Sequence, residues 1–163
     1  MTPSEINAPR GVRIRIEYTD QPLYRYGSYE PAKGWFTTQR KRAPIVNSEE
    51  MREEGLAYFR AALKEQGVAG EVSLEEVASF DPDWCTPPGG TIRECMEQTP
   101  LTEAELAEKL GLPDVKGLLE GETVINPELA QKLSDTLGGS QPFWIALDGN
   151  YREGLRKGLT VMR

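Results

Sequence analysis

The sequence predicts a small α+β domain, an antiparallel sheet with one helix, followed by an all-α domain of five short helices. Two observations predict this order: alternating apolar residues in the first half of the chain, and a succession of capped amphipathic segments in the second. With 163 residues, 38% of them hydrophobic and 28% charged, the composition is typical of folded domains. We expect domains at 1–80 and 91–163, joined by a proline- and glycine-rich linker at 81–90.

The first half contains strand patterns and then a helix pattern. Residues 11–18 alternate apolar and charged side chains, which is typical of a half-buried strand, and residues 23–30 and 33–42 predict two further strands. A helical period then predicts a helix over 47–67, with Asn47 and Glu50 as its capping box and Gly67 as its end. Ser73 with Glu76 predicts the cap of a shorter helix.

Cations and aromatic residues are interleaved in the first 42 residues. Cations that follow a nucleic-acid backbone beside aromatic faces that stack on bases are what a nucleic-acid-binding sheet requires. The alternative is that the aromatic residues fill the core of a small domain while the arginines face water. The candidate DNA contacts are Arg13, Arg15, Arg40, Lys41 and Arg42. The role of residues 1–80 stays open.

The second half reads as five helices, most of which have a recognisable cap or stop. Thr102 with Glu105 forms a capping box and Gly111 ends that helix, while Asn126 caps a later helix that has Pro127 at its first position. Short helices with a tight corner between the second and third predict a helix-turn-helix bundle. The five expected helices are 91–99, 103–110, 115–121, 126–138 and 140–158.

A family resemblance adds to this pattern. The segments "PPGGTIRECMEQTPLTEAELAEKLG", "LLEGE" and "INPELAQKLSDTLGGSQPFWIALDGNY" resemble the HigA-type antitoxins, a branch of the xenobiotic-response-element (XRE) class of helix-turn-helix regulators that is also common in phages. The resemblance covers residues 87–157. It implies a homodimer that binds operator DNA through its third helix to repress transcription of its own gene, and that is often paired with a small ribonuclease toxin.

The resemblance implies DNA contacts at Thr102, Lys116 and Thr123, but the sequence departs from the family around them. Glu103 stands where the family commonly has a glutamine that reaches a phosphate, and Glu122 stands where it tends to have a cation. Only six residues separate "LG" from "LL", where about eight are usual in the family the segment resembles. DNA contact by the third helix is therefore weakened.

The distribution of charge also indicates weak DNA binding by the second half of the chain. Residues 1–47 contain eight Lys and Arg against four Asp and Glu, whereas residues 81–163 contain eight against fourteen. Affinity for phosphates scales with the cations that a surface offers. The alternative function is therefore a degenerate helix-turn-helix that has lost DNA binding and serves dimerisation or holds a basic protein partner.

Three aromatic residues of the fifth helix, Phe143, Trp144 and Tyr151, are candidates for a dimer or partner interface, with core packing as the alternative. The chain has no histidine and no catalytic or phosphate-loop motif, so we expect no enzyme, no cofactor and no metal site. Cys85 and Cys95 are expected to be free. The absence of a membrane-length apolar run and of a signal-peptide pattern predicts a cytoplasmic protein.

Overall fold

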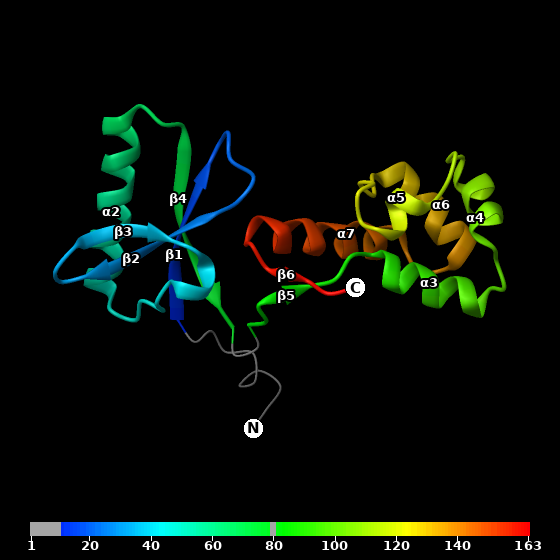
Figure 1. Ribbon diagram of the computed structural model, residues 1–163, viewed down its shortest axis with the longest axis horizontal. Helices are drawn as coiled ribbons and strands as arrows, with labels where there is room; N and C mark the ends of the chain where they lie inside the picture. Colours follow the sequence, from blue (N-terminus) through cyan, green and yellow to red (C-terminus); the bar gives the residue numbers. More distant parts are fainter. Residues whose placement is uncertain (1–10, 79–80) are drawn as a thin grey trace, which may run out of the picture. The chain divides into compact units, whose positions relative to one another are not determined.

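The computed structural model describes residues 11–78 and 81–163, which belong to two compact units. The first, called here the sheet unit, comprises Met1–Asp83 and Arg156–Gly158, and the second, the helical unit, comprises Trp84–Leu155 and Leu159–Arg163. Figure 1 traces both units as ribbons. Within the described residues, no helix has the length and apolar character needed to cross a membrane.

The sheet unit is built on a four-stranded antiparallel sheet with the strand order β3-β2-β1-β4. Helix α2 (Glu49–Gln66) packs against β1 and β4, along one side of the sheet in Figure 1. A short 3-10 helix, η1 (Arg40–Arg42), follows the third strand. The strands are β1 (Gly11–Tyr18), β2 (Arg25–Glu30), β3 (Gly34–Thr38) and β4 (Gly70–Val77).

The apolar side of β1 faces α2. Ile14 and Ile16 are fully buried there and pack with Phe59 of α2 and with residues of the neighbouring strands. Gly27 and Gly55 let the helix lie close to the sheet, since an added Cβ at Gly27 would overlap the ring of Phe59 and one at Gly55 would overlap Ile14. The expected sheet with one helix is therefore confirmed, and its core lies between the two.

Two of the local expectations for this unit were wrong. Ser48, not Asn47, caps α2, because Ser48 has the extended backbone and accepts the amide of Met51 through its hydroxyl. Ser73 and Glu76 lie in β4 and start no helix, because this segment pairs with β1 along its whole length. Long-range strand pairing thus overrides a local capping pattern.

The helical unit follows the expected succession of helices around one core. Its fully buried members include Ile92, Leu106, Leu118 and Leu133. Residues 81–90, expected as a linker, contain β5 and the first residues of α3, and β5 pairs in parallel with β6 near the end of the chain. The elements are β5 (Trp84–Cys85), α3 (Gly89–Gln98), α4 (Glu103–Leu110), α5 (Lys116–Leu119), α6 (Pro127–Leu137), α7 (Gln141–Arg156) and β6 (Thr160–Val161). Both cysteines are free, as the sequence predicts.

Candidate functional site

Helix α4 begins with a complete capping box. The hydroxyl of Thr102 accepts the amide of Glu105 at 3.3 Å, and the carboxylate of Glu105 accepts both the amide and the hydroxyl of Thr102 at 2.8 Å. These hydrogen bonds, the one from the backbone amide foremost, hold the pKa of Glu105 below its usual value. The hydroxyl of Thr102, a predicted DNA contact, is therefore engaged in holding the helix start.

A tight turn leads from α4 to α5. Gly111 ends α4 with a left-handed backbone at φ 69°, and Asp114 then accepts the amide of Lys116 at 2.9 Å. The helix that follows is a single turn of four residues, of which Leu118 and Leu119 are buried. A carboxylate therefore already occupies the start of α5, a place where helices often bind phosphate.

The segment after α5 folds back onto it. Glu122 and Thr123 donate their backbone amides to the carbonyl oxygen of Gly117 at 2.8 and 3.0 Å. An added Cβ at Gly117 would lie 2.9 Å from the Thr123 hydroxyl oxygen. The close approach of Thr123 explains why a glycine stands at position 117. Thr123, another predicted DNA contact, therefore packs beside α5.

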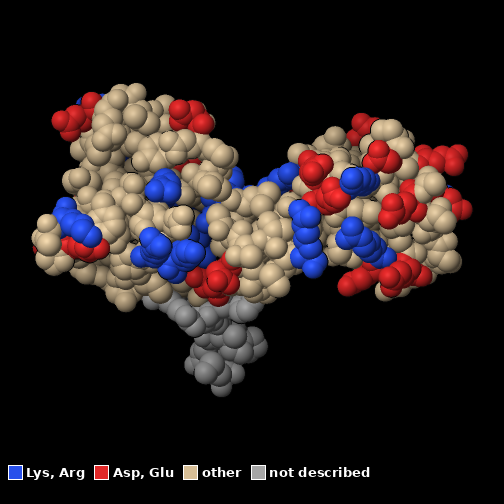
Figure 2. All heavy atoms as spheres, in the orientation of Figure 1, with Lys and Arg blue, Asp and Glu red and all other residues tan. Residues whose placement is uncertain are grey.

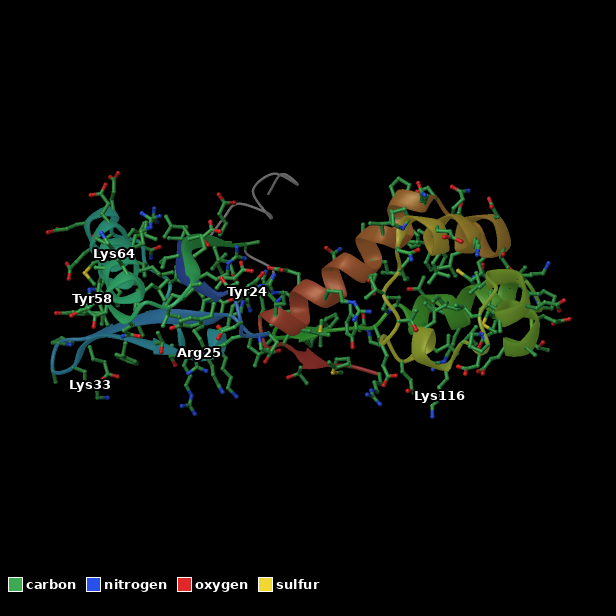
Figure 3. All side chains as sticks on the ribbon, turned by 90° about the horizontal axis from the view of Figure 1, so that it is seen from above. Tyr24, Arg25, Lys33, Tyr58, Lys64 and Lys116 are labelled. Atoms are coloured by element: carbon green, nitrogen blue, oxygen red, sulfur yellow. The ribbon has the colours of Figure 1, made fainter. Side chains whose placement is uncertain are left out.

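A groove runs along the surface between α4 and α5 and is called here the α4–α5 groove. Its volume is about 460 Å³. Its charged lining consists of Glu103, Glu108, Asp114 and Lys116, which are three carboxylates and one cation. Figure 3 shows Lys116 extending away from the unit, and in Figure 2 acidic side chains gather over α4. The apolar lining is Ala104, Ala107, Leu112, Pro113 and Val115.

A second hollow of about 320 Å³ adjoins the first, between α3 and α4. Met96, Pro100 and Leu101 form its apolar part. Glu103 lines both hollows, because it is the first residue of α4. This glutamate therefore belongs to two depressions that each have apolar residues in their lining, an arrangement that the sequence alone did not reveal.

Two of the predicted DNA-binding arginines of the sheet unit belong to an internal ion-pair network. Arg40 is only 8% exposed, with its Nε 3.0 Å from the carboxylate of Glu75, and it also pairs with Asp81. Arg13 contacts the second carboxylate oxygen of Asp81 at 2.9 Å. Burial alone would raise the pKa of Asp81, but the hydrogen bonds and charges of Arg13 and Arg40 lower it below its usual value.

Two of the aromatic residues beside these cations are also internal. Tyr26 is fully buried and donates its hydroxyl to Glu75 at 2.7 Å; burial first, and this hydrogen bond second, raise the pKa of Tyr26 far above its usual value. Arg15 lies over the buried ring of Tyr24, at 4.6 Å from its centroid. Among the five predicted cations, Lys41 and Arg42 in η1 are the exposed ones. The buried Tyr24 and Tyr26 therefore fit the alternative interpretation, in which the aromatic residues fill the core of a small domain.

The predicted aromatic interface on α7 separates into one surface residue and two core residues. Phe143 is 44% exposed, whereas Trp144 is 1% exposed and donates its indole N–H to the carbonyl oxygen of Gly138. Tyr151 is buried as well. Sequence reasoning missed the exposed Ile145, although its helical offset from the buried positions of α7 is a signal that could have found it.

Comparisons with protein-family models, with curated proteins and with solved structures found no match. The resemblance to the HigA-type antitoxins therefore depends on the sequence segments quoted above and stays a prediction.

Proposed function

We propose that the chain is a regulatory protein of the helix-turn-helix class, similar to the HigA-type antitoxins, and that its α4–α5 groove binds a basic protein partner instead of operator DNA. In this proposal α4 and α5 are the two helices of the motif, and Gly111 begins the turn. The observation that carries the proposal is the charge of the α4–α5 groove, whose described lining contains the carboxylates Glu103, Glu108 and Asp114 and one cation, Lys116.

The short length of α5 and the carboxylates of α4 and of the turn before it oppose the reading of DNA. A helix of four residues is about 6 Å long, so that it offers one turn to the major groove. Each carboxylate placed beside a phosphate adds repulsion and releases no counterion. Lys116 alone does not compensate for Glu103 and Asp114 on the same face.

The same charges favour a basic protein. Complementary potentials accelerate encounter and select partners, and a carboxylate-rich surface attracts proteins that themselves bind nucleic acid. A small ribonuclease toxin, the partner that the family resemblance implies, is a protein of this kind. The acidic face would then stand in for the nucleic acid that such an enzyme binds.

A homodimer belongs to the same proposal. Ile145 exposes apolar surface on α7, and Ala146 and Gly149, which lie beside it on the helix and are also exposed, leave room for a second helix to approach. We propose the face of Ile145, Ala146 and Gly149 as the dimer contact, in place of the buried Trp144 and Tyr151, with the exposed Phe143 at its border.

Operator binding is the second candidate function. The observation that favours it is the exposure of Lys116 at the first position of α5, together with that of Lys41 and Arg42 in η1. These cations would contact phosphates and would make binding strongly dependent on salt.

A gel-shift assay separates the two functions. The full chain is titrated onto the DNA upstream of its own gene at low and at moderate salt, beside the variants Lys116→Glu and Lys64→Glu. Lys64 is exposed on α2 and serves as the control with the same change of net charge. The proposal predicts no shift at either salt concentration. A salt-sensitive shift that Lys116→Glu abolishes and Lys64→Glu preserves would instead establish operator binding.

A further inference from the structure

We propose that the α4–α5 groove and the adjoining α3–α4 hollow form one docking site for a basic amphipathic segment of the partner protein. Two apolar side chains of that segment would enter the two hollows, and a cation between them would pair with Glu103. This inference depends on the proposed function and specifies the chemistry of the partner.

The shape of the α4–α5 groove favours apolar side chains. Ala104 and Ala107 lie three positions apart on α4 and carry only a methyl group each, so they leave depth between this helix and the turn. Leu112 and Val115 also line the groove. With about 460 Å³, the groove falls within the range of roughly 300–1,000 Å³ that is usual for ligand pockets.

The neighbouring hollow repeats this chemistry on the other side of Glu103. Met96 and Leu101 are apolar residues of its lining, and Arg93 and Glu97 also line it. The charges of Arg93 and Glu97 cancel, so that the carboxylate of Glu103 leaves the hollow with a net negative charge. An apolar side chain here and another in the α4–α5 groove would place a central cation beside Glu103.

The rim of the α4–α5 groove determines the sign of the partner's charge. Glu103, Glu108 and Asp114 outnumber Lys116, so the groove carries a net negative charge. A segment with several arginines or lysines would be attracted, and an acidic segment would be repelled. Nucleic acid would also be repelled, because its phosphates are negatively charged like the groove.

The test uses a synthetic amphipathic peptide of arginine and leucine with helical spacing, and a scrambled peptide of the same composition. Binding to the full chain is measured by calorimetry and by amide chemical shifts. We expect the amphipathic peptide to bind more tightly than the scrambled one and to shift the amides of Met96, Ala107 and Leu112. Equal binding of both peptides, or shifts confined to the sheet unit, would overturn the inference.

Two variants and their controls test the geometry. Ala104→Phe fills the α4–α5 groove from an exposed position and should abolish the preference for the amphipathic peptide, whereas Ala61→Phe, at an exposed position of α2, should preserve it. The double variant Glu103→Gln, Glu108→Gln should weaken binding by about tenfold, as expected for the loss of exposed ion pairs. Glu94→Gln on the exposed side of α3 should leave the affinity unchanged. If Ala104→Phe bound the amphipathic peptide as tightly as the unchanged chain, the docking site would lie elsewhere.

The outcomes also distinguish this inference from the proposed function. A salt-sensitive gel shift that Lys116→Glu abolishes and Lys64→Glu preserves would refute the proposed function. A negative gel shift together with peptide binding that ignores Ala104→Phe would refute only the docking site.

Discussion

Replacing Gly89 with alanine should destabilise the helical unit, whereas the same change at Gly90 should stabilise it. Both glycines lie in the first turn of α3 and neither has a positive φ, so alanine can adopt either backbone conformation. An added Cβ at Gly89 would overlap the carbonyl oxygen of Leu119 and lie 2.8 Å from the Cα of that residue. At Gly90 an added Cβ would meet no atom of residues 11–78 and 81–163 within 4 Å.

The magnitudes follow from these contacts. The obstacle at Gly89 is backbone and cannot rotate away, so α3 must separate from the end of α5, and overpacking of this kind costs about 1–3 kcal/mol. For a unit of this size we expect Gly89→Ala to lower the Tm by on the order of 10 °C. Gly90→Ala should add about 0.4–1 kcal/mol to the free energy of unfolding, because alanine restricts the unfolded chain and favours helix.

The assay is urea unfolding of the full chain, followed by the helical circular dichroism signal for the original sequence and both variants. If Gly89→Ala proved as stable as Gly90→Ala, α3 would not rest on Leu119. The inference that α3 supports α5 would then be wrong.

Three further predictions concern other parts of the chain. Thr102→Ala should lower the free energy of unfolding by about 1 kcal/mol, while Thr102→Ser, which keeps the cap, should change it little in urea titrations. The pKa of Asp81 is lowered in the folded state, so its contribution to stability is present above the unfolded pKa and is lost as pH falls through the folded pKa. Asp81→Asn should therefore flatten the loss of stability that we expect below about pH 4. An acid unfolding profile unchanged by this substitution would contradict the Arg40–Asp81 pair. Ile145→Asp should convert the proposed dimer to a monomer in sedimentation, and persistence of the dimer would place its contact elsewhere.

Local capping signals predicted the helical unit well. The Thr102–Glu105 box and the glycine at position 111 involve neighbours within one helical turn, so the sequence contains all of their partners. The start of α6 was predictable for the same reason, because its signals are also local. Pro127 has a fixed φ that suits the first helical position, and Asn126 directly before it caps the helix.

Features that depend on distant residues were not predictable in this way. The cap pattern of Ser73 and Glu76 is locally sound, but pairing with β1 decides the conformation of the segment. Arg40 looks like a surface cation until Glu75 and Asp81, more than thirty positions away, surround it. Burial of charges requires tertiary partners, which periodicity does not reveal.

The candidate site was predictable from the sequence only in part. The carboxylates Glu103 and Asp114 are visible in the sequence, and their sign alone predicted weak DNA binding. The return of Thr123 onto Gly117, and the position of Glu103 between two hollows, depend on how the turn and α3 pack. Charge was therefore predictable, and the shape of the surface was not.

Contact between α5 and DNA can be tested by titrating the isotope-labelled full chain with its own upstream DNA at low salt and observing the backbone amides from Glu103 to Thr123. We expect these amide signals to stay unchanged, because the carboxylates of the α4–α5 groove repel phosphates. Shifts at Lys116 and its neighbours that vanish as salt is raised would contradict the proposed function and would make α5 a DNA-reading helix.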